Sequence, residues 1–128
     1  MATRTDRLTK VLDLQEKLKK LHETRQATHA AQARAADAEA EDVVQAFNAE
    51  GSLSSLFPEL YHARIASATA AKQHHLANVQ VETLRVAKAS ARVDAVHREV
   101  VISRRADERV IEERDQTEAL SRHRAHSK

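Results

Sequence analysis

The sequence contains no cysteine or tryptophan, and only one glycine and one proline among its 128 residues. Without cysteine there is no disulfide and no thiolate ligand for a metal. With a single glycine there is no glycine-rich loop to hold a phosphate or a dinucleotide, and no nucleophile elbow of the kind found in hydrolases. These shortages exclude several common classes of enzyme site.

Large side chains for a globular core are also scarce. Aromatic residues make up 2% of the chain, and much of its 41% hydrophobic content is alanine. A compact globule fills its centre with large side chains at crystal-like density, which this composition does not provide. A charged content of 31% with almost no glycine or proline is instead typical of long helices and coiled coils. The length is that of a single domain.

Long apolar runs are missing as well. The first twenty residues, MATRTDRLTKVLDLQEKLKK, contain neither the apolar core of a signal peptide nor a membrane span. We therefore expect a cytoplasmic protein without integral membrane insertion. The formal net charge is +2, from 21 basic and 19 acidic residues, and does not require nucleic acid or an anionic membrane as a partner.

The only glycine and the only proline lie together in EGSLSSLFPEL, residues 50–60. We predict a first helix over about 4–50, a reversal over 51–58 and a second helix over about 59–124, forming one coiled-coil hairpin over 1–128. Gly51 can adopt the left-handed conformation that ends a helix. Ser54 or Ser55 is expected to cap the second helix, with Pro58 tolerated in its first turn.

The second predicted helix has a seven-residue repeat of the kind that forms coiled-coil seams. One position of the repeat holds Ile65, Lys72, Val79, Val86, Val93 and Val100, and the position three later holds Ala68, His75, Glu82, Ala89, Val96, Ser103 and Val110. The first helix has an apolar stripe at Leu8, Val11, Leu14, Leu18 and Leu21, and after an alanine-rich run the spacing resumes at Ala33, Ala36, Ala40, Val43 and Phe47.

A short loop predicts that the two helices fold back antiparallel. If the reversal centres near residue 54, positions whose numbers add to about 108 face each other. Residues 8–21 then meet 86–100, large against large, and residues 27–40 meet 68–81, small against small. This match favours an intramolecular hairpin over a straight parallel dimer. The predicted fold is all-α, an antiparallel two-helix coiled-coil hairpin whose longer second helix has a C-terminal overhang over 105–124.

Titratable side chains offer little for catalysis or metal binding. No two histidines stand at the four-residue spacing of a helical zinc motif, and neighbouring carboxylates on exposed helices cannot act as a catalytic dyad. We expect no enzyme activity, no cofactor, no catalytic residue and no metal site. Residues 35–50 are acidic without any lysine or arginine, whereas 85–105 is rich in arginine. These stretches are either solvated helix faces or electrostatic docking surfaces.

The hairpin end carries a cluster of large side chains: Leu53, Leu56, Phe57, Leu60 and Tyr61. Two interpretations remain open. The cluster seals the end of the hairpin by packing on Phe47 and Val44, or it binds a partner, because exposed apolar clusters on small proteins often mark interfaces.

The whole pattern resembles the small coiled-coil proteins of bacterial type III export, the flagellar FliJ family and its YscO-type relatives in virulence secretion. The resemblance rests on the leucine-stepped RLTKVLDLQEKLKKL, the alanine-rich run, the single interruption EGSLSSLFPEL and the charged RRADERVIEERDQTEAL. It covers nearly the whole chain. It implies an antiparallel two-helix coiled coil that looks like the central stalk of rotary ATP synthases.

The resemblance also implies partners: an export ATPase hexamer, the export gate protein and substrate chaperones, at the cytoplasmic side of the inner-membrane export apparatus. By this analogy the expected ATPase contacts are Arg4, Arg7, Lys10, Leu14, Arg98, Arg104, Arg105, Arg109, Val110, Ile111 and Arg114. The expected gate contacts are Phe57, Leu60, Tyr61 and Arg64.

Two other functions remain possible on the residues alone. One is a generic structural or scaffolding coiled coil, which needs no more than the heptads provide. The other is a weak nucleic-acid binder that uses the basic stretch 85–105. That stretch lacks interleaved aromatic residues and has carboxylates close by, so we expect no nucleic acid among the partners.

Overall fold

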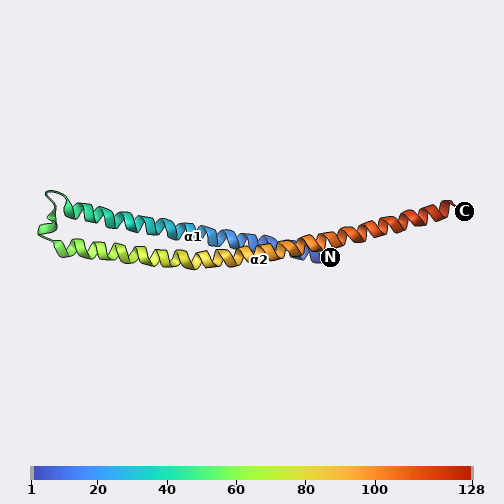
Figure 1. Ribbon diagram of the computed structural model, residues 1–128, viewed down its shortest axis with the longest axis horizontal. Helices are drawn as coiled ribbons and strands as arrows, with labels where there is room; N and C mark the ends of the chain where they lie inside the picture. Colours follow the sequence, from blue (N-terminus) through green and yellow to red (C-terminus); the bar gives the residue numbers. More distant parts are fainter. Residues whose placement is uncertain (1, 128) are drawn as a thin grey trace. The chain divides into compact units, whose positions relative to one another are not determined.

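A computed structural model describes residues 2–127. It contains two long helices, α1 (Arg4–Asn48) and α2 (Pro58–His126), with the short 3-10 helix η1 (Leu53–Ser55) between them (Figure 1). No strand occurs in this part of the chain. The helices pack against each other, and the predicted all-α two-helix hairpin with a longer second helix is confirmed.

The chain divides into two compact units. Unit 1 combines the first helix as far as Lys17 with the second helix from Ala89 onward, and unit 2 is Leu18–Lys88. The assignment of residues 1–128 to a single domain stays a prediction.

The start of α1 is set by a reciprocal capping arrangement. The backbone N–H of Asp6 donates to Oγ1 of Thr3 at 3.1 Å, and the backbone N–H of Thr3 donates to Oδ2 of Asp6 at 3.1 Å. Two N–H groups that lack partners within the helix are thereby satisfied. The hydrogen bonds from the backbone and side chain of Thr3 hold the pKa of Asp6 below its ordinary value.

The reversal follows the expected positions at Gly51 and Pro58 but uses a different serine. Gly51 has a φ of +73°, and Pro58 is the first residue of α2. The capping residue is Ser52, and it caps η1: its Oγ accepts from the backbone N–H of Ser54 and donates to the carbonyl of Phe47. The prediction that Ser54 or Ser55 caps α2 was wrong, because both residues belong to the 3-10 turn that precedes it.

Gly51 offers a direct test of the turn. A β-carbon built at this position meets nothing within 4 Å, so an alanine there is strained only through its backbone. We expect Gly51→Ala to lower the free energy of unfolding by about 1 kcal/mol, and Gly51→Asn to lower it by less, since asparagine tolerates the left-handed region. Urea unfolding followed by circular dichroism measures both. Equal stability of the alanine variant and the parent would contradict this account of the turn.

In unit 1 the helices pair in the predicted register. The hydroxyl of Thr5 is hydrogen-bonded to that of Ser103 and donates to Asp107 at 2.6 Å, and Arg4 forms an ion pair with Glu99 at 3.4 Å. Val100 is the most buried side chain, with 1% of its surface exposed. Val110, predicted as a seam residue, is 47% exposed, because α1 begins at Arg4 and no residue of α1 lies opposite it.

The apolar stripe predicted for the start of α1 was wrong in part. Val11 and Leu14 are 41% and 55% exposed, and Leu21, in unit 2, is 42% exposed. The half-buried positions in this part of unit 1 are Thr5, Leu8, Leu12 and Gln15. The face that meets α2 is therefore partly polar, and a search for large apolar residues selected a neighbouring face.

In unit 2 the seam is made of alanine, valine and polar side chains. The buried apolar residues are Ala33, Ala36, Val43 and Ala68. Asp37 and Lys72 form an ion pair across the helices at 2.9 Å, and Nε2 of Gln26 donates to Thr83 at 2.9 Å. Alanine buries little area, so cross-helix polar pairs supply much of the specificity of this seam.

Glu82 lies inside this seam, with 3% of its surface exposed. Nδ1 of His22 donates to Oε2 of Glu82 at 2.9 Å, and Nη1 of Arg85 donates to Oε1 at 2.8 Å. Burial raises the pKa of Glu82, but the hydrogen bonds from His22 and Arg85 lower it by more, so its net pKa lies below the ordinary value. The ionised carboxylate is thus favoured in the folded state.

Val100 tests the packing of unit 1. We expect Val100→Ala to lower the free energy of unfolding by roughly 2 kcal/mol more than Ile102→Ala, because each buried methylene contributes about 0.8 kcal/mol and a cavity remains. Ile102 is 58% exposed and also β-branched, so it has a similar gain in helix propensity on change to alanine. Chemical unfolding of both variants measures the difference. Equal losses would show that Val100 is not a core residue.

Glu82 tests the polar seam through pH. Its pKa is lowered on folding, so its stabilising contribution is present above the ordinary value of 4.5 and is lost as pH falls through the folded-state pKa. We expect Glu82→Gln to weaken the fall in stability below about pH 4.5, whereas Glu23→Gln, at a half-exposed site, leaves it nearly unchanged. Urea midpoints between pH 3 and 7 measure this. Identical pH profiles for Glu82→Gln and the parent would refute the assignment.

Candidate functional site

An open cleft of about 410 Å³ lies in unit 2 where the chain reverses. The last turns of α1 form one wall, through Glu39, Asp42, Val43 and Ala46. The turn η1 and the first two turns of α2 form the other wall, through Leu53, Phe57, Leu60, Tyr61 and Arg64. The cleft exists because the chain leaves α1 through Gly51 and a 3-10 turn before α2 begins, which carries large side chains to the side of the seam.

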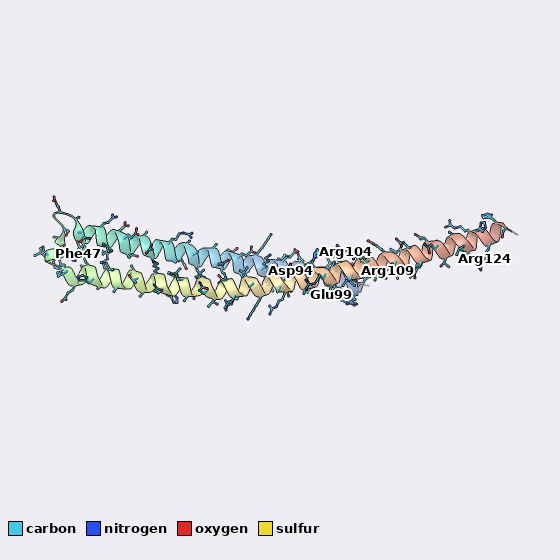
Figure 2. All side chains as sticks on the ribbon, viewed as in Figure 1. Phe47, Asp94, Glu99, Arg104, Arg109 and Arg124 are labelled. Carbon is cyan, nitrogen blue, oxygen red and sulfur yellow. The ribbon has the colours of Figure 1, made fainter. Side chains whose placement is uncertain are left out.

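Beside the cleft, aromatic contacts join the two helices. Phe47, near the end of α1 (Figure 2), meets the ring of Tyr61 edge-on, with centroids 5.8 Å apart and an interplanar angle of 73°. It also contacts the ring of His62 at 5.3 Å. Val43, one helical turn earlier, is 7% exposed. These contacts join the end of α1 to the start of α2 next to the cleft, and they fix the position of Tyr61, which lines it.

The apolar walls of the cleft are open to solvent. Leu53 is 55% exposed, Phe57 53% and Leu60 58%. Of the residues expected either to seal the hairpin or to bind a partner, Tyr61 packs on Phe47, while these three keep more than half of their surface in water. Packing within the hairpin therefore does not account for them. A group of large apolar side chains this exposed on a small protein is typical of an interaction surface.

The rim of the cleft is charged. Glu39 and Asp42 lie on the α1 side and Arg64 on the α2 side, and all three are exposed. Within residues 2–127 none of the three forms an ion pair. The nearby Asp37, in contrast, is engaged by Lys72. The rim charges are thus available to a ligand, with carboxylates on one side and a guanidinium on the other.

All four residues predicted to contact an export gate, Phe57, Leu60, Tyr61 and Arg64, line this cleft. The sequence analysis did not place Glu39 and Asp42 beside them, although it identified the acidic stretch to which they belong. The signal was available in the register, because positions that add to about 108 bring residues 42–46 of α1 opposite 62–66 of α2.

The residues predicted to contact an ATPase lie in unit 1, and each of them is exposed. They do not form one compact site. Arg104 and Arg105 are consecutive and therefore point about 100° apart around α2, and Arg4 is already paired with Glu99. In the stretch 104–111, Arg104 lies beside the start of α1 and Arg109 lies further toward the C-terminus, beyond it (Figure 2). Val110 and Ile111 are the large apolar residues of that stretch, 47% and 56% exposed.

Three further features of the described residues concern metal ligands, helix hydrophobicity and the buried carboxylate. Between residues 2 and 127 no three histidine, aspartate or glutamate side chains are grouped so as to hold a metal ion. Over the same residues no helix has an apolar stretch sufficient to cross a bilayer. Glu82 is buried in the seam and hydrogen-bonded to His22 and Arg85, which is the arrangement of a structural carboxylate.

Comparison with known proteins leaves the interpretation to the structure. No protein-family model, curated protein or solved structure matches this chain.

Proposed function

We propose that the chain is a non-catalytic component of a bacterial type III protein export apparatus, a stalk or adaptor between the export ATPase ring and the export gate that assists delivery of chaperone-bound substrates. The proposal starts from the resemblance of the sequence to the FliJ and YscO-type proteins. The fold fits it: the chain is a two-helix hairpin whose second helix is the longer one.

The observation that carries the proposal is the unpaired part of α2. From Arg104 to Ser127 every residue is exposed. An isolated, highly charged helix of this length is marginal in water and gains stability from packing against a partner. Val110 and Ile111 offer an apolar anchor, and the arginines around them offer salt-sensitive contacts. A helix of this kind suits insertion into the central opening of a ring of subunits.

The cleft provides the second contact that an adaptor needs. It lies in unit 2, whereas the unpaired helix belongs to unit 1, so the two surfaces use separate residues. In the proposed function the ATPase takes the unpaired end of α2, and the gate takes the cleft lined by Phe57, Leu60, Tyr61 and Arg64. A scaffolding coiled coil, in contrast, has no need of either surface.

The ATPase contact is tested by titrating the purified chain into the export ATPase of the same organism, with complex formation and ATP hydrolysis as readouts. We expect binding and stimulated hydrolysis. The double variant Val110→Ser/Ile111→Ser should weaken binding by about tenfold, because it removes the apolar anchor. Leu84→Ser, which changes a 66% exposed leucine in unit 2, serves as the control and should bind like the parent.

A truncation complements the point variants. Removal of the residues after Glu108 preserves the contacts of Arg4 and Thr5 with Glu99, Ser103 and Asp107. The shortened chain should remain helical by circular dichroism but should no longer bind the ATPase. Absence of binding by the intact, folded chain would refute the stalk role and favour the scaffolding coiled coil.

A further inference from the structure

The charge around the cleft differs in sign from that of the chain as a whole. Residues 35–64 contain six carboxylates and one guanidinium, a formal charge of −5, whereas the whole chain carries +2. Lys72 engages one of these carboxylates, Asp37. The others include Glu39 and Asp42, which stand at the rim of the cleft. An anionic field of this density attracts cations and repels other anions at close range.

The geometry of the cleft fits one side of a helix. Its apolar walls are formed by Leu53, Phe57 and Leu60, and an amphipathic helix can insert large side chains between such walls. The carboxylates on the α1 side then lie beside the edge of the apolar face of that helix. Lysine or arginine at this edge provides complementary charge. Arg64, on the opposite side, is the one cation of the rim.

From this combination we propose that the cleft binds a cationic amphipathic helix of a partner protein, with large apolar side chains in the cleft and lysine or arginine beside Glu39 and Asp42. The inference deepens the proposed function and rests on it for the presence of a partner at the hairpin end. It excludes nucleic acid and anionic membranes as ligands of this cleft, because both would be repelled by the same carboxylates.

A second copy of the chain is the other occupant to consider, since the last turns of α2 are basic at Arg122 and Arg124. That segment has a single large apolar residue, Leu120, in the stretch 112–127. A helix that docks in a groove uses apolar anchors repeated at three- and four-residue steps. The C-terminal end of α2 therefore supplies the charge but lacks the anchors.

The test uses the full-length chain and two fluorescein-labelled helical peptides of about four turns. Both carry leucine at i, i+3, i+7 and i+10, and the remaining positions are mainly lysine with alanine in one peptide and mainly glutamate with alanine in the other. By fluorescence anisotropy we expect the lysine peptide to bind at least about tenfold more tightly than the glutamate peptide, with an affinity that falls as salt is added.

Matched variants place the binding in the cleft. Leu60→Ser should lower the affinity for the lysine peptide by about tenfold. Leu84→Ser, at a similarly exposed leucine outside the cleft, should leave that affinity unchanged. Glu39→Gln/Asp42→Asn should reduce both the affinity and its salt dependence, whereas Glu112→Gln/Glu113→Gln, in unit 1, should change neither. Circular dichroism establishes that each variant is folded.

Several outcomes would overturn the inference. Equal binding of the two peptides, binding of neither, or binding that survives Leu60→Ser would each do so. Self-association seen by sedimentation and abolished by Leu60→Ser would assign the cleft to a second copy instead. The peptide assay contains no export component, so its failure leaves the ATPase titration valid, and loss of ATPase binding with intact peptide selectivity would refute the stalk role alone.

Discussion

The arrangement of both units depends on where the chain reverses. Each helix keeps a seven-residue period without interruption, so the position of the turn at Gly51 determines which residues meet. Thr5 with Ser103 in unit 1 and Phe47 with Tyr61 in unit 2 belong to the same register, in which the two numbers add to 108. One residue more or less within either helix would rotate the residues that follow it by about 100° and remove the seam residues from one another.

This dependence is strong because the seam is poor in large side chains. Alanine against alanine contributes little burial free energy, and it tolerates several registers nearly equally well. Polar pairs remove that ambiguity, since a buried carboxylate that loses its partners is costly. Of the two partners of Glu82, Arg85 is on the same helix and His22 is on the other, so the hydrogen bond to His22 is the one that depends on the register. The seam of unit 2 is thus less stable than a seam of large apolar side chains would be, but its two helices pair in a defined register.

The second helix and the reversal could be predicted from the sequence, because six successive steps of seven are hard to mistake and one stretch holds both helix breakers. The first helix was harder. The spacing of Ala33, Ala36 and Val43, continued backwards in heptads, leads to Leu12 and Thr5, and both are half-buried. Val11 and Leu14 attracted the prediction because they are large and apolar, but they follow Leu8 in two steps of three, whereas the seam advances by four and then three, to Leu12 and Gln15.

The cleft was predictable only in part for a related reason. The sequence shows an apolar cluster at the hairpin end and an acidic stretch before it. No local pattern, however, indicates whether the leucines of that cluster are buried or exposed in the folded chain. That outcome depends on the reversal, in which Leu53 of the 3-10 turn and Phe57 after it stay more than half exposed, whereas Tyr61 packs on Phe47.

A seam built from alanine has a further consequence for function. Many of the large apolar residues are on the outside instead, among them those at the cleft and along the unpaired part of α2. Neither surface can be buried by the hairpin itself, because the register assigns other residues to the seam. A helical hairpin held by small and polar residues therefore leaves large side chains exposed, and this division of residues is what the proposed adaptor role requires.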